Sequence, residues 1–156
     1  MKFVSEPVVI TGTGCVTPVG INTEQTYDAC IKNQSGIDKV RDIDIENARC
    51  VYAGQVPELW DSERVFPKKR HRMYDRFMLL MFDAVDQALS ESNPLSWYQH
   101  ERVGLSIGSG VGGLKTYHIA GVGFDRGGHR KFSPFWLPSV LINLAGGHIS
   151  QHWDIK

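Results

Sequence analysis

Two glycine-rich segments, residues 11–14 and 108–113, have the composition of turns that bind phosphate through backbone N–H groups. The first follows an apolar run, but Thr17 stands where a dinucleotide-binding fingerprint has its third glycine, and Pro18 comes next. The second lacks the Gly-Lys-Ser/Thr ending of a P-loop, because Lys115 is displaced from that position. A nucleotide site is therefore the minor interpretation. For residues 108–113 an anion-binding turn, the floor of a substrate pocket and a purely structural turn stay open.

The spacing of cysteines and histidines predicts no complete catalytic or metal site. Cys15, Cys30 and Cys50 are odd in number and lack C-x-x-C spacing, so we expect a reducing compartment and no disulfide framework. Cys15 follows the first glycine turn, but nothing in the sequence places a base beside it. His148 and His152 are four residues apart and would share a helix face, yet no third ligand accompanies them. We expect no metal site.

Two small groups of basic residues could attract an acidic partner. Over the whole chain, 17 Lys and Arg residues balance 17 Asp and Glu residues, which argues against a general nucleic-acid binder. The local groups are Lys68, Lys69, Arg70 and Arg72, and then Arg130 and Lys131. A solvated face explains each group as well as docking of an acidic partner does.

The segments around these residues predict an α/β fold. Residues 8–10 and 102–107 are short apolar runs, each leading into a glycine turn, and we expect both to be strands. Because helical patterns separate them, we expect the two strands to be parallel with the glycine turns at their carboxyl ends, where α/β folds build their sites. Residues 37–66 are less periodic, and residues 50–56 are the best short strand there.

Helices are predicted between and after these strands. Asn22 can cap a helix over about residues 23–33, and apolar residues recur every three or four positions from Tyr74 until Asn93-Pro94 ends the pattern. Further helices are expected from Leu114 and over about residues 139–153.

Five segments in order along the chain form a pattern more specific than either glycine turn alone. They are VVITGTGCVTPVG at 8–20, QSGI at 34–37, MYDRF at 73–77, IGSGVGG at 107–113 and SPFWLP at 133–138. Together they resemble the N-terminal part of a β-ketoacyl-acyl-carrier-protein synthase of the elongating type. The resemblance implies that residues 1–156 are an incomplete N-terminal portion of a thiolase-like layered α/β fold, with the remainder of the domain absent from this chain.

The resemblance also implies a reaction. An acyl chain carried as a cysteine thioester condenses with malonyl-acyl-carrier protein, carbon dioxide is lost, and the product is a 3-oxoacyl chain two carbons longer. The family uses a cysteine nucleophile and two histidines, with the cysteine at a helix N-terminus that favours its thiolate. None of the three cysteines or six histidines matches these residues. We assign no catalytic residue in this chain and expect it to be inactive alone.

The resemblance carries over two sets of binding residues. The rim and floor of the acyl pocket correspond to Gly110, Val111, Leu114, Trp136 and Leu137. The residue at the position of Trp136 reaches across a homodimer interface in the family and is more often phenylalanine. Positions associated with carrier-protein docking correspond to Lys69, Arg72, Arg130 and Lys131, whereas Met73 departs from a commonly basic position.

The implied partners are acyl-carrier protein, acyl and malonyl thioesters, and a second copy in the complete enzyme. No cofactor, nucleic acid or membrane is implied; the uncharged stretch 132–153 holds two prolines, and the N-terminus has no extended apolar region. We expect a cytoplasmic protein. One alternative is a non-catalytic synthase-like partner that supplies a pocket wall or a carrier-docking face, and a weaker one is a nucleotide-binding α/β domain.

Overall fold

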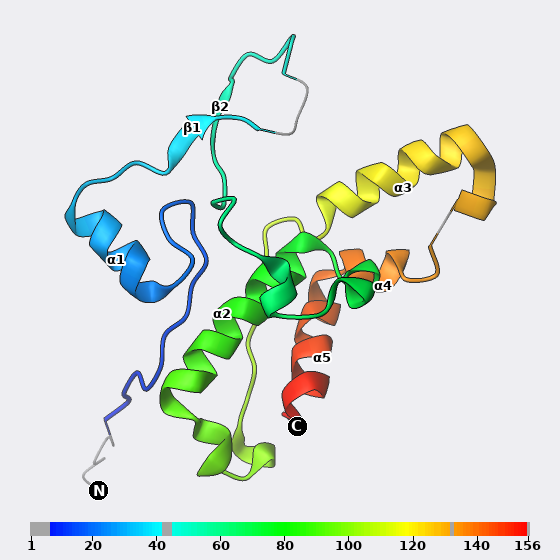
Figure 1. The fold of residues 1–156 in the computed structure, drawn as a ribbon. Coiled ribbons are helices and arrows are strands. Elements are labelled where there is room, and N and C mark those ends of the chain that lie inside the picture. The colour runs from blue at the N-terminus through cyan, green and yellow to red at the C-terminus, as the bar shows by residue number, and fades with distance from the viewer. Residues whose placement is uncertain (1–6, 42–44, 132, 156) are drawn as a thin grey trace, which may run out of the picture.

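The computed structural model describes residues 7–41, 45–131 and 133–155, except for the side chain of Lys131, and most of its regular structure is helical (Figure 1). The α-helices are α1 (Thr23–Ile31), α2 (Arg76–Ser92), α3 (Leu114–Gly127), α4 (Trp136–Val140) and α5 (Ile142–Trp153). The strands are β1 (Ile37–Lys39) and β2 (Tyr52–Gly54). Short 3₁₀ helices are η1 (Ser62–Arg64), η2 (Lys68–Met73), η3 (Pro94–Ser96), η4 (His100–Arg102) and η5 (Gly128–Lys131).

The long helix predicted after Tyr74 is α2, and its ends follow from its sequence. The Asp75 side chain accepts the Phe77 N–H at 3.1 Å and so caps the first turn. The helix ends at Asn93, which adopts the left-handed conformation (φ 43°) directly before Pro94. The predicted helix beginning after Asn22 is also confirmed: Asn22 Oδ1 accepts the Gln25 N–H at 2.8 Å.

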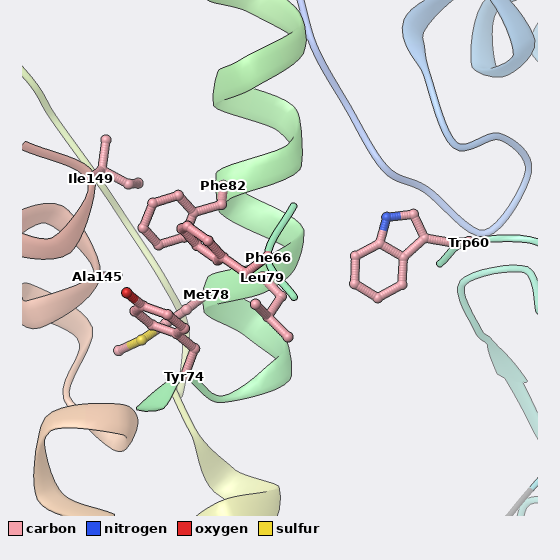
Figure 2. Close-up of a cluster of buried hydrophobic side chains, with 8 residues drawn as sticks. All are labelled: Trp60, Phe66, Tyr74, Met78, Leu79, Phe82, Ala145 and Ile149. Carbon is pink, nitrogen blue, oxygen red and sulfur yellow. The ribbon is translucent and has the colours of Figure 1, made fainter. Parts of the chain in front are cut away.

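The core lies where α2 packs against α5 (Figure 2). Met78 and Phe82 of α2 and Ile149 of α5 are fully buried, and Leu79 and Ala145 are buried beside them. Burying a large apolar side chain stabilises a fold by about 1.5–3 kcal/mol. The spacing in the sequence predicted a different stripe, and its residues are only half-buried beside this face: Phe77, Leu80, Met81, Ala84, Val85, Ala88 and Leu89.

Aromatic rings from the segment before α2 extend this core. Phe66 stacks on Tyr74 with ring centroids 5.0 Å apart and meets Phe82 edge-on at 4.8 Å. The Arg70 guanidinium lies 4.5 Å from the Phe66 ring centroid, and the His152 ring lies edge-on to Phe66 at 5.2 Å. Trp60, Phe66 and Tyr74 therefore belong to the core, whereas the Lys and Arg side chains of η2 are exposed.

A buried carboxylate on α2 anchors the segment that holds Trp60. Asp83 is 2% exposed; its Oδ2 accepts Trp60 Nε1–H at 2.6 Å, and its Oδ1 accepts Gln87 Nε2–H at 2.9 Å. Arg64 Nε lies 3.6 Å from Asp83 Oδ2. A buried charge is tolerated when it is paired and hydrogen-bonded in this way.

Residues 12–21 of the N-terminal segment lie against the face of α2 that carries Ala84 and Gln87. Gln87 accepts the Cys15 N–H at 3.3 Å and donates to the Ile21 carbonyl at 3.0 Å. A Cβ at Gly14 would collide with the Ala84 carbonyl oxygen, so the first glycine turn lets the backbone approach α2 closely.

The expected parallel sheet is wrong for the described residues. Neither residues 8–10 nor residues 102–107 form a strand there, and the sheet that the structure does contain pairs β1 with β2 antiparallel, with Ile37 opposite Gly54. Residues 100–102 form η4 instead. A strand needs a neighbouring backbone to complete its hydrogen bonds. Here Leu105 and Ile107 pack against the core, whereas the side chains of residues 8–10 are exposed, so the two segments do not pair with each other. The β2 strand does lie within the predicted range 50–56.

The single helix predicted over residues 139–153 is also corrected. Leu141 is extended (φ −78°, ψ 129°) and separates α4 from α5. The Val140 carbonyl accepts the N–H of Gly113 at 3.1 Å, so its hydrogen bond goes to another segment instead of continuing the helix.

Within the described ranges, no helix is long and apolar enough to cross a membrane.

We predict that Asp83→Ala lowers the free energy of unfolding of the chain by about 3 kcal/mol, because it leaves the Trp60 and Gln87 donors and Arg64 without their buried acceptor. Urea unfolding followed by circular dichroism measures the change. Asp86→Ala, at an exposed position one turn further along α2, is the matched control and should change the free energy by less than about 0.5 kcal/mol. Equal effects of the two substitutions would contradict an anchoring role.

Candidate functional site

The second glycine turn packs directly against α4. The Gly113 N–H donates to the Val140 carbonyl at 3.1 Å, and the Ser109 hydroxyl accepts the Gly112 N–H at 3.1 Å. Gly112 has φ +73°, and a Cβ there would lie 2.6 Å from the Val140 oxygen. A Cβ at Gly113 would lie 2.7 Å from Val140 Cα. Glycine is therefore required at both positions for this contact.

The five residues expected to line an acyl pocket lie on this turn and on the two helices next to it, α3 and α4. Gly110 and Val111 are in the turn, Leu114 is the first residue of α3, and Trp136 and Leu137 begin α4. Val111 is 65% exposed, Leu114 61% and Leu137 50%. The elements thus present apolar side chains outward near one another, as one wall of an apolar binding site would.

The indole ring of Trp136 lies toward α3. Its ring centroid is 5.7 Å from that of Tyr117, with the two planes at 40°. Trp136 is half-buried, whereas Tyr117 is exposed. The packing of the Trp136 ring against α3 places a bulky group where α4 meets α3.

A separate cleft of about 180 Å³ lies away from this junction, beside the β1–β2 hairpin. Its lining residues are Pro18, Ser35, Gly36, Asp38, Arg41, Ala53, Gln55 and Pro57. None of the predicted pocket residues contributes to it. It is shaped by the turn before α1 and the hairpin.

The basic residues expected to dock a carrier protein fall in two places. Lys69 and Arg72 are exposed on η2, and the Arg72 guanidinium lies 5.4 Å from the ring centroid of Phe135, the residue before α4. Arg130 is exposed on η5, at the far end of α3 from the glycine turn (Figure 1). The side chain of Lys131 lies outside the described part of the chain. The structure thus brings η2, but not η5, next to α4.

Cys15 and two of the histidines make packing contacts, whereas the other two cysteines are exposed. Cys15 Sγ lies 3.4 Å from the Thr26 hydroxyl, and the His148 ring is edge-on to Tyr74 at 5.2 Å. Burial lowers the pKa of His148, which favours the neutral form of its ring. His152 packs edge-on against the core rings, and no group of three metal-binding side chains occurs among the described residues.

One residue at this junction was not singled out by the sequence. Asp75 directly precedes the first residue of α2, and an Asp at this position is a usual signal for an N-cap. Its carboxylate also reaches Thr116 on α3, 41 residues away, and no local pattern signals that second contact.

Comparison with known proteins identifies what this chain is similar to. The family described as "Beta-ketoacyl synthase, N-terminal domain" matches residues 5–156. The 3-oxoacyl-[acyl-carrier-protein] synthase 2 of Vibrio cholerae is 35% identical over 144 residues, which cover 92% of this chain and 34% of the relative. The enzyme of the same name from Staphylococcus aureus is 33% identical over the same shares. This chain therefore spans about a third of the length of these relatives.

Solved structures share the fold. A type II ketosynthase in complex with its acyl-carrier protein superposes with a TM-score of 0.75 at 17% identity, covering 95% of this chain and 40% of that one. A β-ketoacyl synthase from Burkholderia phymatum gives a TM-score of 0.76 at 19% identity, with 95% and 37% covered. The described elements are thus a partial ketosynthase-like fold.

We predict that Gly113→Ala separates the glycine turn from α4 and destabilises the chain by about 1–3 kcal/mol, because the added methyl group overlaps Val140. Gly108→Ala is the control, since a Cβ at Gly108 meets no atom within 4 Å. Urea unfolding of the two variants of this chain measures the difference. A control as unstable as Gly113→Ala would show that the loss comes from helix or turn propensity rather than from the contact.

Proposed function

Because the chain belongs to the family of β-ketoacyl synthase N-terminal domains, we propose that the protein containing it lengthens acyl chains by decarboxylative condensation. An acyl group held as a thioester is attacked by the carbon nucleophile released when malonyl-acyl-carrier protein loses carbon dioxide. A carbon–carbon bond forms, the enzyme thiol leaves, and the product is a 3-oxoacyl-carrier protein two carbons longer.

The observation that carries this proposal is the contact between the glycine turn and α4. It brings together the glycine turn with α3 and α4, the elements that carry the five candidate pocket residues. The side chains of Val111, Leu114 and Leu137 are exposed there. An acyl chain is bound by burying apolar surface, at about 25 cal/mol per Å². We assign Gly110, Val111, Leu114, Trp136 and Leu137 to the rim and floor of the acyl pocket.

The role proposed for this chain is binding rather than bond making. Its cysteines lack a neighbouring base in the described contacts; Cys15, for example, lies beside the Thr23 and Thr26 hydroxyls. We therefore propose that the nucleophile and the two histidines of the complete enzyme lie outside residues 1–156. The same feature favours the alternative of a non-catalytic synthase-like partner, and the activity of the complete protein separates the two.

Carrier-protein docking is the second proposed binding role. Lys69, Arg72 and Arg130 are exposed cations, and Lys131 follows Arg130 in the sequence. A similar ketosynthase has been solved in complex with its acyl-carrier protein. An acidic carrier would be steered to such residues by charge, which raises the association rate more than the final affinity. In the complete enzyme we propose a homodimer, with Trp136 near the interface.

The proposed function is tested by assaying the complete protein with acyl primers of different lengths and malonyl-acyl-carrier protein. We predict that it forms 3-oxoacyl products and that Trp136→Phe improves kcat/KM for long primers relative to short ones by about tenfold, because bulk is removed from the pocket end. Trp97→Phe, at a 76% exposed position, is the matched control. The 156-residue chain alone should yield no product.

An unchanged chain-length profile would eliminate Trp136 as the residue that limits pocket depth. Absence of condensation by the complete protein would support the non-catalytic alternative.

We further predict that the double charge reversal Lys69→Glu and Arg72→Glu in the complete protein slows carrier association by about tenfold at low salt. The difference should shrink at 1 M salt, where screening acts within about 3 Å. Stopped-flow binding measures the rate, and Lys39→Glu on the exposed β1 strand is the control. Equal association rates for the double variant and the control would remove η2 from the docking surface.

A further inference from the structure

Helix α3 begins without a capping side chain of its own. The residue before it is Gly113, which offers no side-chain acceptor for the free N–H groups of the first turn. The acceptor comes from elsewhere: Asp75 Oδ2 accepts the N–H of Thr116, the third residue of α3, at 3.2 Å. This is the N–H that a normal N-cap side chain would bind.

The same carboxylate also caps α2. Its other oxygen, Oδ1, accepts the Phe77 N–H at 3.1 Å, so each oxygen of Asp75 serves a different helix. Asp75 is 6% exposed. A negative charge is favoured at the N-terminal end of a helix, and here one charge is placed at two such ends.

The position of Asp75 is set by the core. Its neighbour Tyr74 packs against Phe66 and Phe82, with ring centroids 5.0 Å and 5.5 Å away (Figure 2). Asp75 therefore joins the first turn of α3 to the buried core. This turn also contacts α4, through the hydrogen bond from Gly113 to Val140 and the ring contact of Tyr117 with Trp136.

We propose that Asp75 is a positioning residue for the acyl pocket: by capping α2 and α3 together, its carboxylate fixes Val111 and Leu114 relative to Trp136 on α4. The inference rests on the proposed function, because it assumes that these side chains contact the acyl chain. Without the link, the first turn of α3 keeps its contacts with α4 but loses its tie to the start of α2, and the apolar wall can spread. Acyl primers then bind more weakly and are discriminated less by length.

The test uses the complete enzyme with Asp75→Asn and Asp75→Ser. Both residues are good N-caps, so α2 keeps its start, but each supplies a single acceptor oxygen instead of two. We expect KM for the acyl primer to rise at least fivefold, KM for malonyl-acyl-carrier protein to stay unchanged, and amide hydrogen exchange of residues 114–117 to accelerate. Asp61→Asn is the matched control, since Asp61 caps η1 through Glu63 two residues on.

Several results overturn the inference. An unchanged KM for the primer, with or without faster exchange, shows that the link does not set the pocket. A lower kcat and a lower melting temperature, with the KM values of both substrates unchanged, show a purely structural role. Failure of the proposed function is recognised separately: wild-type enzyme then forms no condensation product. If the wild type is active and Trp136→Phe alters primer preference while both Asp75 variants leave it unchanged, only this inference fails.

Discussion

The Asp83 carboxylate, buried on α2 with hydrogen bonds from Trp60 and Gln87, is the polar group on which the packing of the segments around α2 depends. Through Trp60 it fixes the chain that leads to η1, and through Gln87 it is connected to the N-terminal segment at Cys15. Apolar packing alone is non-directional and would tolerate sliding of these segments along α2. A buried charge tolerates less sliding, because each lost donor leaves the carboxylate less compensated.

Helix α2 thus carries two buried aspartates with different tasks. Asp83, in the middle of the helix, fixes what lies beside α2, whereas Asp75, at its start, fixes where α3 begins. Between them lie Met78 and Phe82, which are buried in one cluster with Ala145 and Ile149 of α5. Because the polar anchors flank the apolar stripe, the helix is restrained along its axis as well as toward the core.

Local signals predicted the helices well and long-range pairing poorly. The Asn22 cap and the apolar spacing of α2 act within a few residues, so α1 and α2 could be located from the sequence. The break at Leu141 depends on where the Val140 carbonyl finds its partner, and that partner is Gly113. The candidate pocket residues came from family resemblance; the structure adds their placement on touching elements, while their roles remain predictions.

Side-chain exposure in the extended segment before the second glycine turn also bears on the proposed pocket. Leu105 and Ile107 are partly buried against the core while Gly104 and Ser106 between them are exposed, so this segment is covered on one face only. Val111 and Leu114, just beyond it, are likewise open on one side. Under the proposed function, a wall open on one side would bind an acyl chain once a second surface closed over it. We therefore propose that primer length is set by the depth that Trp136 leaves and by how firmly Asp75 holds the first turn of α3.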